Sequence, residues 1–487
     1  MKPSLATALL LLLGTLLAGP LRGEAIYLAP RQDGLPGSGK KGDPYDVSTQ
    51  PKFDALLRKF YLAQKPVEFH FAPGTYLTLG EWGNYGGDNW AALSGWKFYG
   101  AGMDRTILKL AAYRYLKPAD KFPDSGYVIS QAPWGRSGIE VKDLTVDCNW
   151  TGFATCTTAP FPLPAAGAAL QIAVADAAKL SPVVGKYIYL QNPDRSGVGI
   201  YTLLSIDGPG TITACNDGAA DPRARNGYDE IKFQGTVVPP GCLVAPELDT
   251  TGISIGSIGS IVERVHVTNT GAPVSEECLG ICIVAIGGER PVKPGSGNIV
   301  RDCLVDNLWG QEGWGITMVS NNPDTGDDGT RIEGWVEGNT VLSTGGTHQG
   351  LSGWGTGRIV WRHNVVRDCR VGWFEDSGYD REQIIEDNLF ENNRTGIQIG
   401  SGSYWKNGVI RGNTLVVPPG RTGILCNGKV GDSVIANNRI VSSGPGVGLN
   451  ANPAEGHGNT VSGNQISPSL SVLVPPEFIR APMAAAQ

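Results

Sequence analysis

The sequence lacks several features that would assign it to common functional classes. None of its nine cysteines lies in a CxxC pair, and no cluster of histidine and cysteine has the spacing of a zinc site. Beyond the N-terminal region, no segment has an apolar run long enough to span a membrane. Only 18% of the residues are charged and the net charge is −6, so no general affinity for nucleic acid or for an anionic membrane is expected.

The first 25 residues are predicted to be a secretory signal peptide. Lys2 supplies the positive start, residues 8–18 are apolar, and the stretch Gly23-Glu24-Ala25 offers small residues around a cleavage site. The apolar run is too short to span a membrane. The mature protein is therefore expected to be soluble and either secreted or periplasmic.

An oxidising compartment permits disulfides, although the odd number of cysteines leaves at least one thiol over. Cys148 with Cys156, and Cys215 with Cys242, are the pairs predicted from their proximity in the sequence and their loop context. Cys426 is expected to face the core.

An asparagine recurs at nearly constant spacing through the C-terminal half. It occupies the same place in VEGNTVL, WRHNVVR, IEDNLFE, IRGNTLV, IANNRIV and VSGNQIS, with steps of 25, 24, 25, 25 and 26 residues. These asparagines are Asn339, Asn364, Asn388, Asn413, Asn438 and Asn464. A second column combines Gly with an apolar pair, as in GISI, GICI, GITM, GIQI and GILC. Such a period is typical of a repeat architecture in which each unit is buried only against its neighbours.

Each repeat contains two or three short alternating runs rich in Val and Ile and bounded by Gly and Asn, which predicts strands and turns. We expect one coil per repeat, with successive coils stacked at roughly 4.8 Å. Asn can adopt a left-handed backbone and can bond to the Asn of the next coil. Asn388 is therefore predicted to be one rung of an asparagine ladder, and Gly396 to start the next front strand.

The remaining segments complete the expected organisation. Residues 51–64 are predicted to form an amphipathic helix, which Ser48 or Thr49 could cap and which would cover the N-terminal end of the core. The period is absent for about a hundred residues before GISI, where five strand-like runs predict a small β-barrel or sandwich. The predicted domains are a signal peptide (1–25), the cap and first coils (26–150), an inserted β domain (151–251), the coils with the groove (252–466) and a C-terminal tail (467–487).

With these repeats, the chain resembles the right-handed parallel β-helix proteins of the pectate-lyase-like superfamily. The segments IYLAPRQDGLPGSGKKGDPYD, PVEFHFAPGTYL, GWKFYGAGMDRTIL and SGIEVKDLTVD extend the resemblance to the capping helix and first coils. It implies an all-β solenoid with an N-terminal capping helix. It does not specify a substrate, because this scaffold carries hydrolases, lyases, epimerases and adhesins.

Two long coils and a concentration of aromatic residues predict a groove. The intervals from Gly280 to Gly315 and from Gly315 to Gly350 are both 35 residues, and the extra length lies in loops that follow front strands. Seven of the twelve Trp lie between residues 309 and 405. Trp354 and Trp405 are expected to line the groove, whereas Trp335 and Trp361 fit core packing.

The stretch GWFEDSGYDREQ is the main candidate for chemistry, because its strand ends in two acids. Alternation directs Asp376 outward and Glu375 inward, where an unpaired carboxylate would be costly. β-Helix glycosidases often have a carboxylate here, but Gln398 stands where their second acid would lie. Asp376 is predicted to act with Glu375 or Glu312, and His348 to position groups or transfer protons. The alternative is a salt bridge from Asp376 to Arg381 or Arg358.

Other residues near these coils are predicted to bind the substrate or a metal ion. The predicted substrate-binding residues are Trp354, Trp405, Tyr379, Tyr404, Gln398, Arg381 and Asn321. Asp324, Asp327 and Asp328 have oxygen ligands that suit Ca²⁺, although their loop lacks the spacing of a known calcium loop. No cofactor is required by the predicted reaction. The isolated His70, His266, His363 and His457 are expected to be turn or stack residues.

The sequence therefore predicts a carbohydrate-active enzyme that hydrolyses glycosidic bonds of a polysaccharide or oligosaccharide. One alternative is a polysaccharide lyase that acts on a uronate-containing glycan, with His348, Arg290, Lys293 or Arg381 as base or cation and Ca²⁺ at the Asp loop. The other is a non-catalytic sugar-binding β-helix. Neither nucleic acid nor a membrane is an expected partner, and the oligomeric state is left open.

Overall fold

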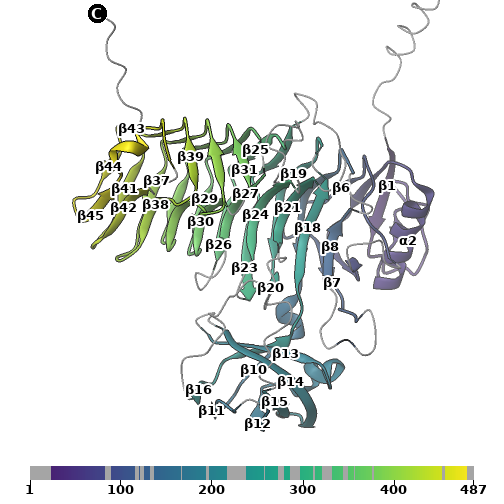
Figure 1. The fold of residues 1–487 in the computed structure, drawn as a ribbon. Coiled ribbons are helices and arrows are strands. Elements are labelled where there is room, and N and C mark those ends of the chain that lie inside the picture. The colour runs from purple at the N-terminus through teal and green to yellow at the C-terminus, as the bar shows by residue number, and fades with distance from the viewer. Residues whose placement is uncertain are drawn as a thin grey trace, which may run out of the picture.

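The computed structural model shows an all-β solenoid with a small β domain projecting from its middle (Figure 1). The chain is a right-handed parallel β-helix, which confirms the fold predicted from the repeats. The residues that the structure describes are 23–82, 89–115, 120, 126–131, 136–165, 167–193, 197–216, 237–256, 258–272, 279–285, 297–310, 313–320, 332–343, 349–355, 357–375, 378–451 and 456–479. Within them, no helix is long and apolar enough to cross a membrane.

One face of the solenoid is an eleven-stranded sheet, called the front sheet below. Its strands pair in parallel, except at the antiparallel contact of the first two. They are β5 (Glu81–Trp82), β8 (Gly126–Ser130), β18 (Thr250–Gly256), β21 (Leu279–Ala285), β24 (Trp314–Ser320), β27 (Gln349–Trp354), β30 (Val371–Glu375), β34 (Thr395–Ile399), β38 (Thr422–Cys426), β42 (Gly446–Ala451) and β45 (Leu470–Leu473).

The other faces belong to a 23-stranded sheet that contains two parallel ladders. The first ladder, called the back ladder below, comprises β1 (Glu24–Ala29), β3 (Val67–Phe71), β6 (Lys97–Tyr99), β9 (Glu140–Asp147), β19 (Ile261–Thr268), β22 (Asn298–Arg301), β25 (Gly334–Glu337), β28 (Ile359–Arg362), β32 (Ile384–Glu386), β36 (Val409–Arg411), β40 (Val434–Ala436) and β43 (Thr460–Ser462).

The second ladder shares β9 and β19 with the first. Its other strands are β4 (Gly74–Thr78), β7 (Thr106–Leu110), β23 (Leu304–Gly310), β26 (Thr340–Ser343), β29 (Val365–Arg367), β33 (Leu389–Glu391), β37 (Thr414–Val416), β41 (Arg439–Val441) and β44 (Gln465–Ile466). The two-residue strands β2 (Tyr45–Asp46) and β20 (Gly271–Ala272) pair with β1 and β23.

Three short strands form a separate sheet after the front strands of three successive coils. They are β31 (Tyr379–Arg381), β35 (Tyr404–Lys406) and β39 (Lys429–Gly431). They pair in parallel, so one residue of each coil stacks on its equivalent in the next. We call these three strands the edge sheet. Its first strand, β31, comes shortly after β30 in the chain, where the predicted site lies.

The predicted asparagine ladder is present and confirmed. The side-chain amide of each rung donates to Oδ1 of the next rung at 2.9 Å, from Asn339 through to Asn464. Asn388 also donates to the carbonyl of Trp361 at 2.8 Å, and its Oδ1 accepts from the backbone N–H of Asn364 at 3.0 Å. Each rung thus satisfies buried backbone groups that the turn leaves unpaired.

The left-handed backbone occurs one residue earlier than expected. The residues with positive φ are those immediately before the ladder asparagines: Gly338, His363, Asp387, Gly412, Asn437 and Gly463. The ladder asparagine itself is selected for its amide, which can donate and accept at once, while the preceding position is selected for tolerance of positive φ.

The glycine column has a separate cause in close packing between coils. A Cβ at Gly396 would lie 2.5 Å from Leu415 Cδ2 and 2.7 Å from the carbonyl oxygen of Gly423. The same approach recurs at Gly423, whose added Cβ would lie 2.5 Å from the Gly448 oxygen. The coils can therefore stack at their usual spacing only without a side chain at this position.

Charged residues alternate in sign along the outer surface of the back ladder. Strand register places Glu263, Arg301, Glu337, Arg362, Glu386 and Arg411 in one row, one residue per coil. Arg301 lies 2.9 Å from Glu263, Arg362 lies 2.7 Å from Glu337, and Arg411 lies 2.6 Å from Glu386. Each such pair is individually weak, but the alternation leaves every charge in the row beside an opposite one.

The N-terminal end is covered by the helix α2 (Gln50–Ala63), close to the predicted span of 51–64 (Figure 1). Phe53, Leu57 and Phe60 are buried, as the apolar spacing predicted, while Leu56 is only partly buried. Thr49 is the N-cap residue, but its side chain makes no capping hydrogen bond. The pairing of β1 with β3 shows that the solenoid starts at residue 24.

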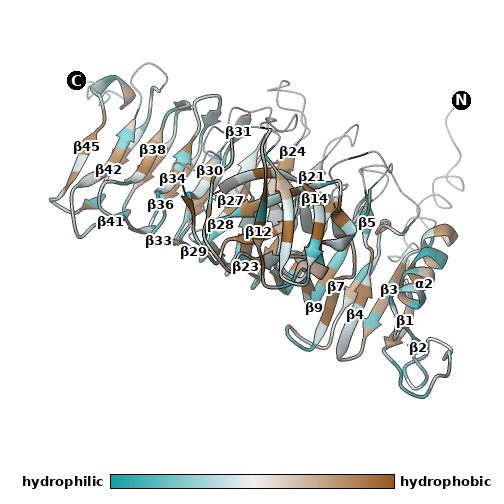
Figure 2. Cartoon of the chain, turned by 90° about the horizontal axis from the view of Figure 1, so that it is seen from below, coloured by the Kyte–Doolittle hydropathy of each residue, from teal (hydrophilic) through white to brown (hydrophobic). Residues whose placement is uncertain are grey.

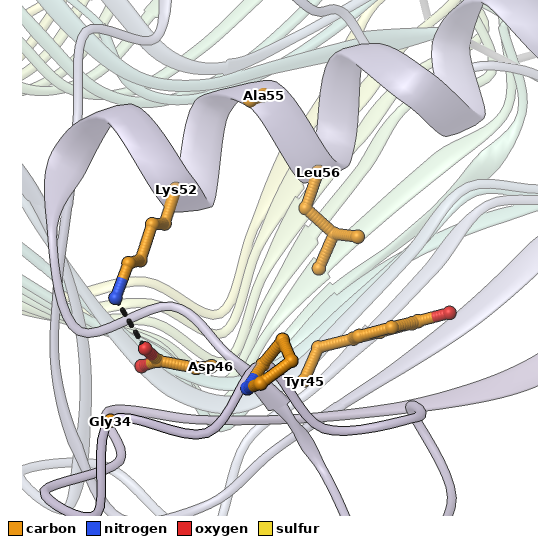
Figure 3. Close-up of a pocket in the computed structure, with 7 residues that line it drawn as sticks. Gly34, Tyr45, Asp46, Lys52, Ala55 and Leu56 are labelled. Carbon is orange, nitrogen blue, oxygen red and sulfur yellow. Dashed lines mark hydrogen bonds and ion pairs between the residues drawn. The ribbon is translucent and has the colours of Figure 1, made fainter.

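A cavity of about 400 Å³ lies between α2 and the segment before it (Figure 3). Tyr45, Leu56 and Pro36 give it an apolar lining, and Lys52 lies 2.5 Å from Asp46 at its side. The hydrogen bond from Lys52 holds the pKa of Asp46 to about 2, against the opposing effect of burial. None of the predicted site residues lines this cavity.

Residues 155–246 form a separate small β unit. Its antiparallel sheet has the order β10 (Thr155–Cys156), β17 (Leu243–Pro246), β13 (Tyr187–Gln191), β14 (Gly197–Gly208), β15 (Thr211–Cys215) and β12 (Ala169–Ala173). A pair, β11 (Phe161–Pro162) and β16 (Val237–Val238), accompanies it. Alternating apolar residues give this unit a core distinct from that of the solenoid. Figure 2 shows hydrophobic and hydrophilic residues interspersed along the strands of the chain.

The predicted disulfides Cys148–Cys156 and Cys215–Cys242 are wrong, since neither pair is bonded although all four residues are described. The thiol of Cys242 donates a hydrogen bond to Asn192 Oδ1 at 3.3 Å. Cys426 is fully buried in the main core, as expected. Proximity in sequence did not decide the pairing, because a disulfide requires specific Cβ geometry.

The C-terminal segment adds one more strand than the repeat indicated. β45 pairs with β42, so the front sheet continues past residue 466 into the expected tail. The 3₁₀ turn Pro476–Phe478 follows, and Phe478 is buried against the last coil. Residues 480–487 and the predicted signal region 1–22 lie outside the described residues.

We expect Asn388→Ala to destabilise the solenoid by on the order of 3 kcal/mol or more, because it removes two donated bonds and strips the acceptor from Asn364. The free energy of unfolding in urea measures this. Gln465→Ala, at an exposed position of β44, is the matched control and should change it by about 0.5 kcal/mol or less. Equal effects of the two substitutions would contradict a stabilising ladder.

Candidate functional site

Strand register aligns one outward residue per coil along the front sheet. This front row consists of Ser130, Ser254, Cys282, Thr317, Ser352, Phe374, Gln398, Leu425 and Asn450. The residues through Phe374 are buried, whereas Gln398, Leu425 and Asn450 are partly exposed. The accessible part of the front row therefore begins at β34.

The buried part of the front row carries a small apolar cluster on its outer side. Cys282, Val284, Trp314 and Val319 pack together, separate from the main core, and Trp354 packs against them while partly exposed. Trp354 thus lies at the end of β27, close to the boundary between the buried part of the front row and its accessible part. Its predicted role in substrate binding stays a prediction.

The edge sheet presents two tyrosines on successive coils. Tyr379 is 45% exposed and Tyr404 is partly exposed, and register pairs them directly. Their ring centroids are 5.3 Å apart with an interplanar angle of 49°. Arg381 and Lys406 form a parallel row two residues further on. The structure therefore brings Tyr379, Tyr404 and Arg381 together, on the two coils that carry β30 and β34.

The acid Glu375 lies inside the solenoid. Its side chain is wholly buried, and its strand neighbours are Gly353 and Ile399. Its backbone carbonyl accepts from the Gly400 N–H at 2.8 Å and from Ser403 Oγ at 3.1 Å. Alternation had placed Glu375 inward, and this is confirmed. Its predicted catalytic role is wrong, because a wholly buried carboxyl cannot contact a polysaccharide on the outer surface.

Trp405 also faces the core, with no exposed surface, so its predicted groove-lining role is wrong. It is the middle residue of β35, between Tyr404 and Lys406, and is in register with the buried Asp380. Alternation in so short a strand directs its central residue inward when its neighbours are outward. Trp361 is a core residue, as predicted, whereas Trp335 is 42% exposed on the back ladder.

Several predicted site residues lie outside the described residues. These are the catalytic candidates Asp376, Glu312 and His348, the substrate-binding candidate Asn321, and the calcium candidates Asp324, Asp327 and Asp328. The described part of the chain contains no cluster of three or more His, Cys, Asp or Glu side chains that could hold a metal.

Sequence reasoning missed a charged cluster around His266. Its Nε2 lies 3.0 Å from Asp306 Oδ1, and its Nδ1 lies 3.5 Å from Asp104 Oδ1. Aligning VERVHVTNT with VRDCLVDNL would have revealed it, since His266 pairs with Leu304 and Asp306 lies two residues further on the same face. Burial alone would lower the pKa of His266, but the hydrogen bonds and charges of Asp306 and Asp104 raise it.

Together these features define a right-handed parallel β-helix protein with an accessible front face and an aromatic edge. A family model described as "Periplasmic copper-binding protein (NosD)" matches residues 296–472, which is less than half of the chain. A search of curated proteins found no significant match.

Solved structures with similar folds include sugar-modifying proteins. The A-module of the Azotobacter vinelandii mannuronan C-5 epimerase AlgE6 is 12% identical, with a TM-score of 0.41, over 88% of this chain and 95% of that one. A Yersinia enterocolitica family 28 exopolygalacturonase is 11% identical, with a TM-score of 0.33, over 91% and 78%. A Thermotoga maritima exopolygalacturonase is 10% identical, with a TM-score of 0.29, over 85% and 88%. Similarity at this level concerns the fold alone.

The described residues do not fit a copper site. Cys303, Cys369 and Cys426 lie in the matched region, but each is buried in the core. Burial raises the pKa of Cys303 and of Cys426 to about 12 and raises that of Cys369 further, which disfavours the thiolate that a metal requires. His363 and His457 are exposed and belong to no metal cluster of the described chain.

We expect His266→Gln to reduce stability more at acidic than at alkaline pH. Because folding raises the pKa of His266, the stabilisation is fully present below the unfolded value of about 6.5 and is lost as pH rises through the folded value. Urea unfolding of both proteins between pH 5 and pH 9 measures the difference. A difference that is independent of pH, or that grows toward alkaline pH, would contradict the assignment. Asp306→Asn should reproduce the pH dependence of His266→Gln.

Proposed function

We propose that this protein is a carbohydrate-active enzyme that hydrolyses glycosidic bonds of a polysaccharide or oligosaccharide on the accessible front face. We also propose that it is secreted or periplasmic. The apolar N-terminal segment supports export, and the family model that matches residues 296–472 is described as periplasmic. The named activities of the fold relatives differ from one another, so the proposal depends on this chain's own residues.

The exposed tyrosine pair is the observation that carries the proposal. Tyr379 and Tyr404 lie on successive coils with their rings 5.3 Å apart, beside the accessible front row. The interior of these coils is already filled by Trp373 and Trp405, so the fold does not need the tyrosines for core packing. A tyrosine combines an apolar ring face with a hydroxyl, which suits the C–H faces and hydroxyls of a sugar.

The proposed chemistry uses two carboxyl groups, assisted by a histidine. Glycoside hydrolysis needs a protonated acid at the leaving oxygen and a second carboxylate as base or nucleophile. Asp376 follows β30 directly in the sequence and is our candidate acid or nucleophile, with Glu312 as the second carboxyl group and His348 as a positioning or proton-transfer group. Gln398, Arg381 and Asn321 supply hydrogen-bonding groups for sugar hydroxyls, and Trp354 supplies a further aromatic face.

The main alternative is a polysaccharide lyase. It would use His348 or Arg381 as base and Ca²⁺ at Asp324, Asp327 and Asp328 to neutralise a uronate. The third reading, a sugar-binding β-helix without catalysis, uses the same tyrosine pair. The three readings differ in product: a new reducing end, a new unsaturated sugar, or no product.

The test is incubation of the purified protein with a panel of neutral and acidic polysaccharides. We expect new reducing ends without the ultraviolet absorbance of an unsaturated product, with and without chelator. Asp376→Asn should abolish turnover while retaining binding. Tyr379→Ala combined with Tyr404→Ala should weaken binding about thirtyfold, since each of the two stacking rings contributes about 1 kcal/mol. Trp335→Ala removes an exposed aromatic from the back ladder and should leave both unchanged.

The outcomes separate the readings. Chelator-sensitive ultraviolet absorbance would replace the hydrolase with the lyase. Binding that needs the tyrosines, with neither product in any member of the panel, would favour the sugar-binding protein. Equal loss of binding in Trp335→Ala would contradict the proposed location of the site.

A further inference from the structure

Three arginines form a column at the start of three successive front strands. Arg370, Arg394 and Arg421 each immediately precede one of the strands β30, β34 and β38. The carbonyl of Arg370 accepts from the Thr395 N–H at 2.9 Å, and that of Arg394 accepts from the Thr422 N–H at 3.3 Å. The arginines are thus stacked at the coil spacing of roughly 4.8 Å.

The column ends at its third member. Gly446 occupies the equivalent position of the next coil, where an added Cβ would lie 2.7 Å from the Arg421 carbonyl oxygen. The column, called the arginine column below, is therefore a bounded feature of three coils. It is visible in the sequence as RVG, RTG and RTG, each ending in the glycine of the repeat.

The arginine column differs from the charged row of the back ladder. In that row every arginine has a glutamate above or below it in the stack. Here like charges stack on like charges. Arg394 and Arg421 are exposed, and neither forms an ion pair within the described chain, although many of its other arginines do.

The nearest acids in the sequence are engaged elsewhere. Glu391 lies 2.6 Å from Arg367, and Asp368 accepts a hydrogen bond from the amide of Asn392. The repeat thus provides charge compensation for other arginines, but not for Arg394 and Arg421. Stacked cations repel one another, so the column disfavours folding unless anions bind to it.

We propose that the arginine column binds an anionic glycan chain that lies along the axis of the β-helix. Successive guanidinium groups would hold successive carboxylate or sulfate groups of the glycan. A guanidinium group can donate two parallel hydrogen bonds to such an anion, which makes arginine the suitable cation for this geometry. The hydroxyls of Thr395 and Thr422, partly exposed beside the column, supply further donors.

The inference deepens the proposed function, because it assigns an acidic glycan to the same front face. The arginine column lies at the start of the front strands, and the tyrosine pair follows their other end. Both features lie on the coils that carry β30 and β34. The inference rests on the proposed function in one respect, that the ligand is a glycan. The anion-binding site itself is inferred from the arginine column alone.

The test measures dissociation constants of the full chain at one fixed ionic strength. The probes are polygalacturonate for carboxylate, dextran sulfate for sulfate, uncharged dextran, and a single-stranded DNA oligonucleotide. We expect at least one acidic glycan to bind more tightly than dextran and DNA. Arg394→Gln combined with Arg421→Gln should weaken that binding about tenfold per arginine. The two acidic probes distinguish a carboxylate site from a sulfate site.

The matched control is Arg105→Gln combined with Arg439→Gln. Both residues are exposed, lie on the second ladder or beside it, and form no ion pair in the described chain, so the net charge changes equally. This control should bind the acidic glycans as the unchanged protein does. An equal loss in the control would overturn the proposal in favour of non-specific charge attraction.

Other outcomes also overturn the proposal. They are unchanged binding in the column variant, failure of every acidic glycan to bind more tightly than dextran, and equally tight arginine-dependent binding of DNA. Cleavage is measured separately with Asp376→Asn. Arginine-dependent binding without cleavage in any variant retains the arginine column and removes the proposed hydrolase. Cleavage of acidic glycans with an unchanged KM in the column variant would retain the proposed hydrolase and overturn the arginine column.

Discussion

The asparagine ladder is the interaction on which the rest of this structure depends. Each rung donates to the next rung and to a backbone carbonyl, and accepts from the coil before, so a shift of one residue would leave several buried polar groups unpaired. Apolar packing alone would tolerate a shift of two residues far better, because inward residues stay inward and the interior consists largely of interchangeable Val, Ile and Leu. The ladder therefore fixes which residues of successive coils stand above one another.

Fixed register turns a repeated sequence position into a row on the surface, and these rows differ in chemistry. The back ladder carries alternating glutamate and arginine, which neutralise one another. The edge sheet carries stacked tyrosines, and the start of the front strands carries stacked arginines. The last two rows are not explained by packing within the fold, which is why both proposals are built on them.

The sequence was sufficient to predict the fold because two recurring positions each have a single physical requirement. The position of Asn388 requires an amide that bridges successive coils, and the position of Gly396 requires a backbone without a side chain. It was less informative about the site. Trp405 occupies a three-residue strand, too short for periodicity to show which way it faces. The cluster of His266, Asp306 and Asp104 depends on pairing between strands that are far apart in the sequence. His266 lies in β19, Asp306 lies in β23, and Asp104 lies just before β7. Glu375 was oriented correctly by alternation, but its burial excludes the catalytic role.

The central claim is that glycans bind along the coils of β30, β34 and β38. Hydroxyl-radical footprinting of the full chain, with and without the polysaccharide that binds most tightly, tests it most directly because it reports side-chain access residue by residue. The account predicts protection of Tyr379 and Tyr404, with no change at Trp335 on the back ladder or at Leu204 in the inserted domain, both of which are exposed. Protection at Leu204 or Trp335 with unchanged tyrosines would contradict it.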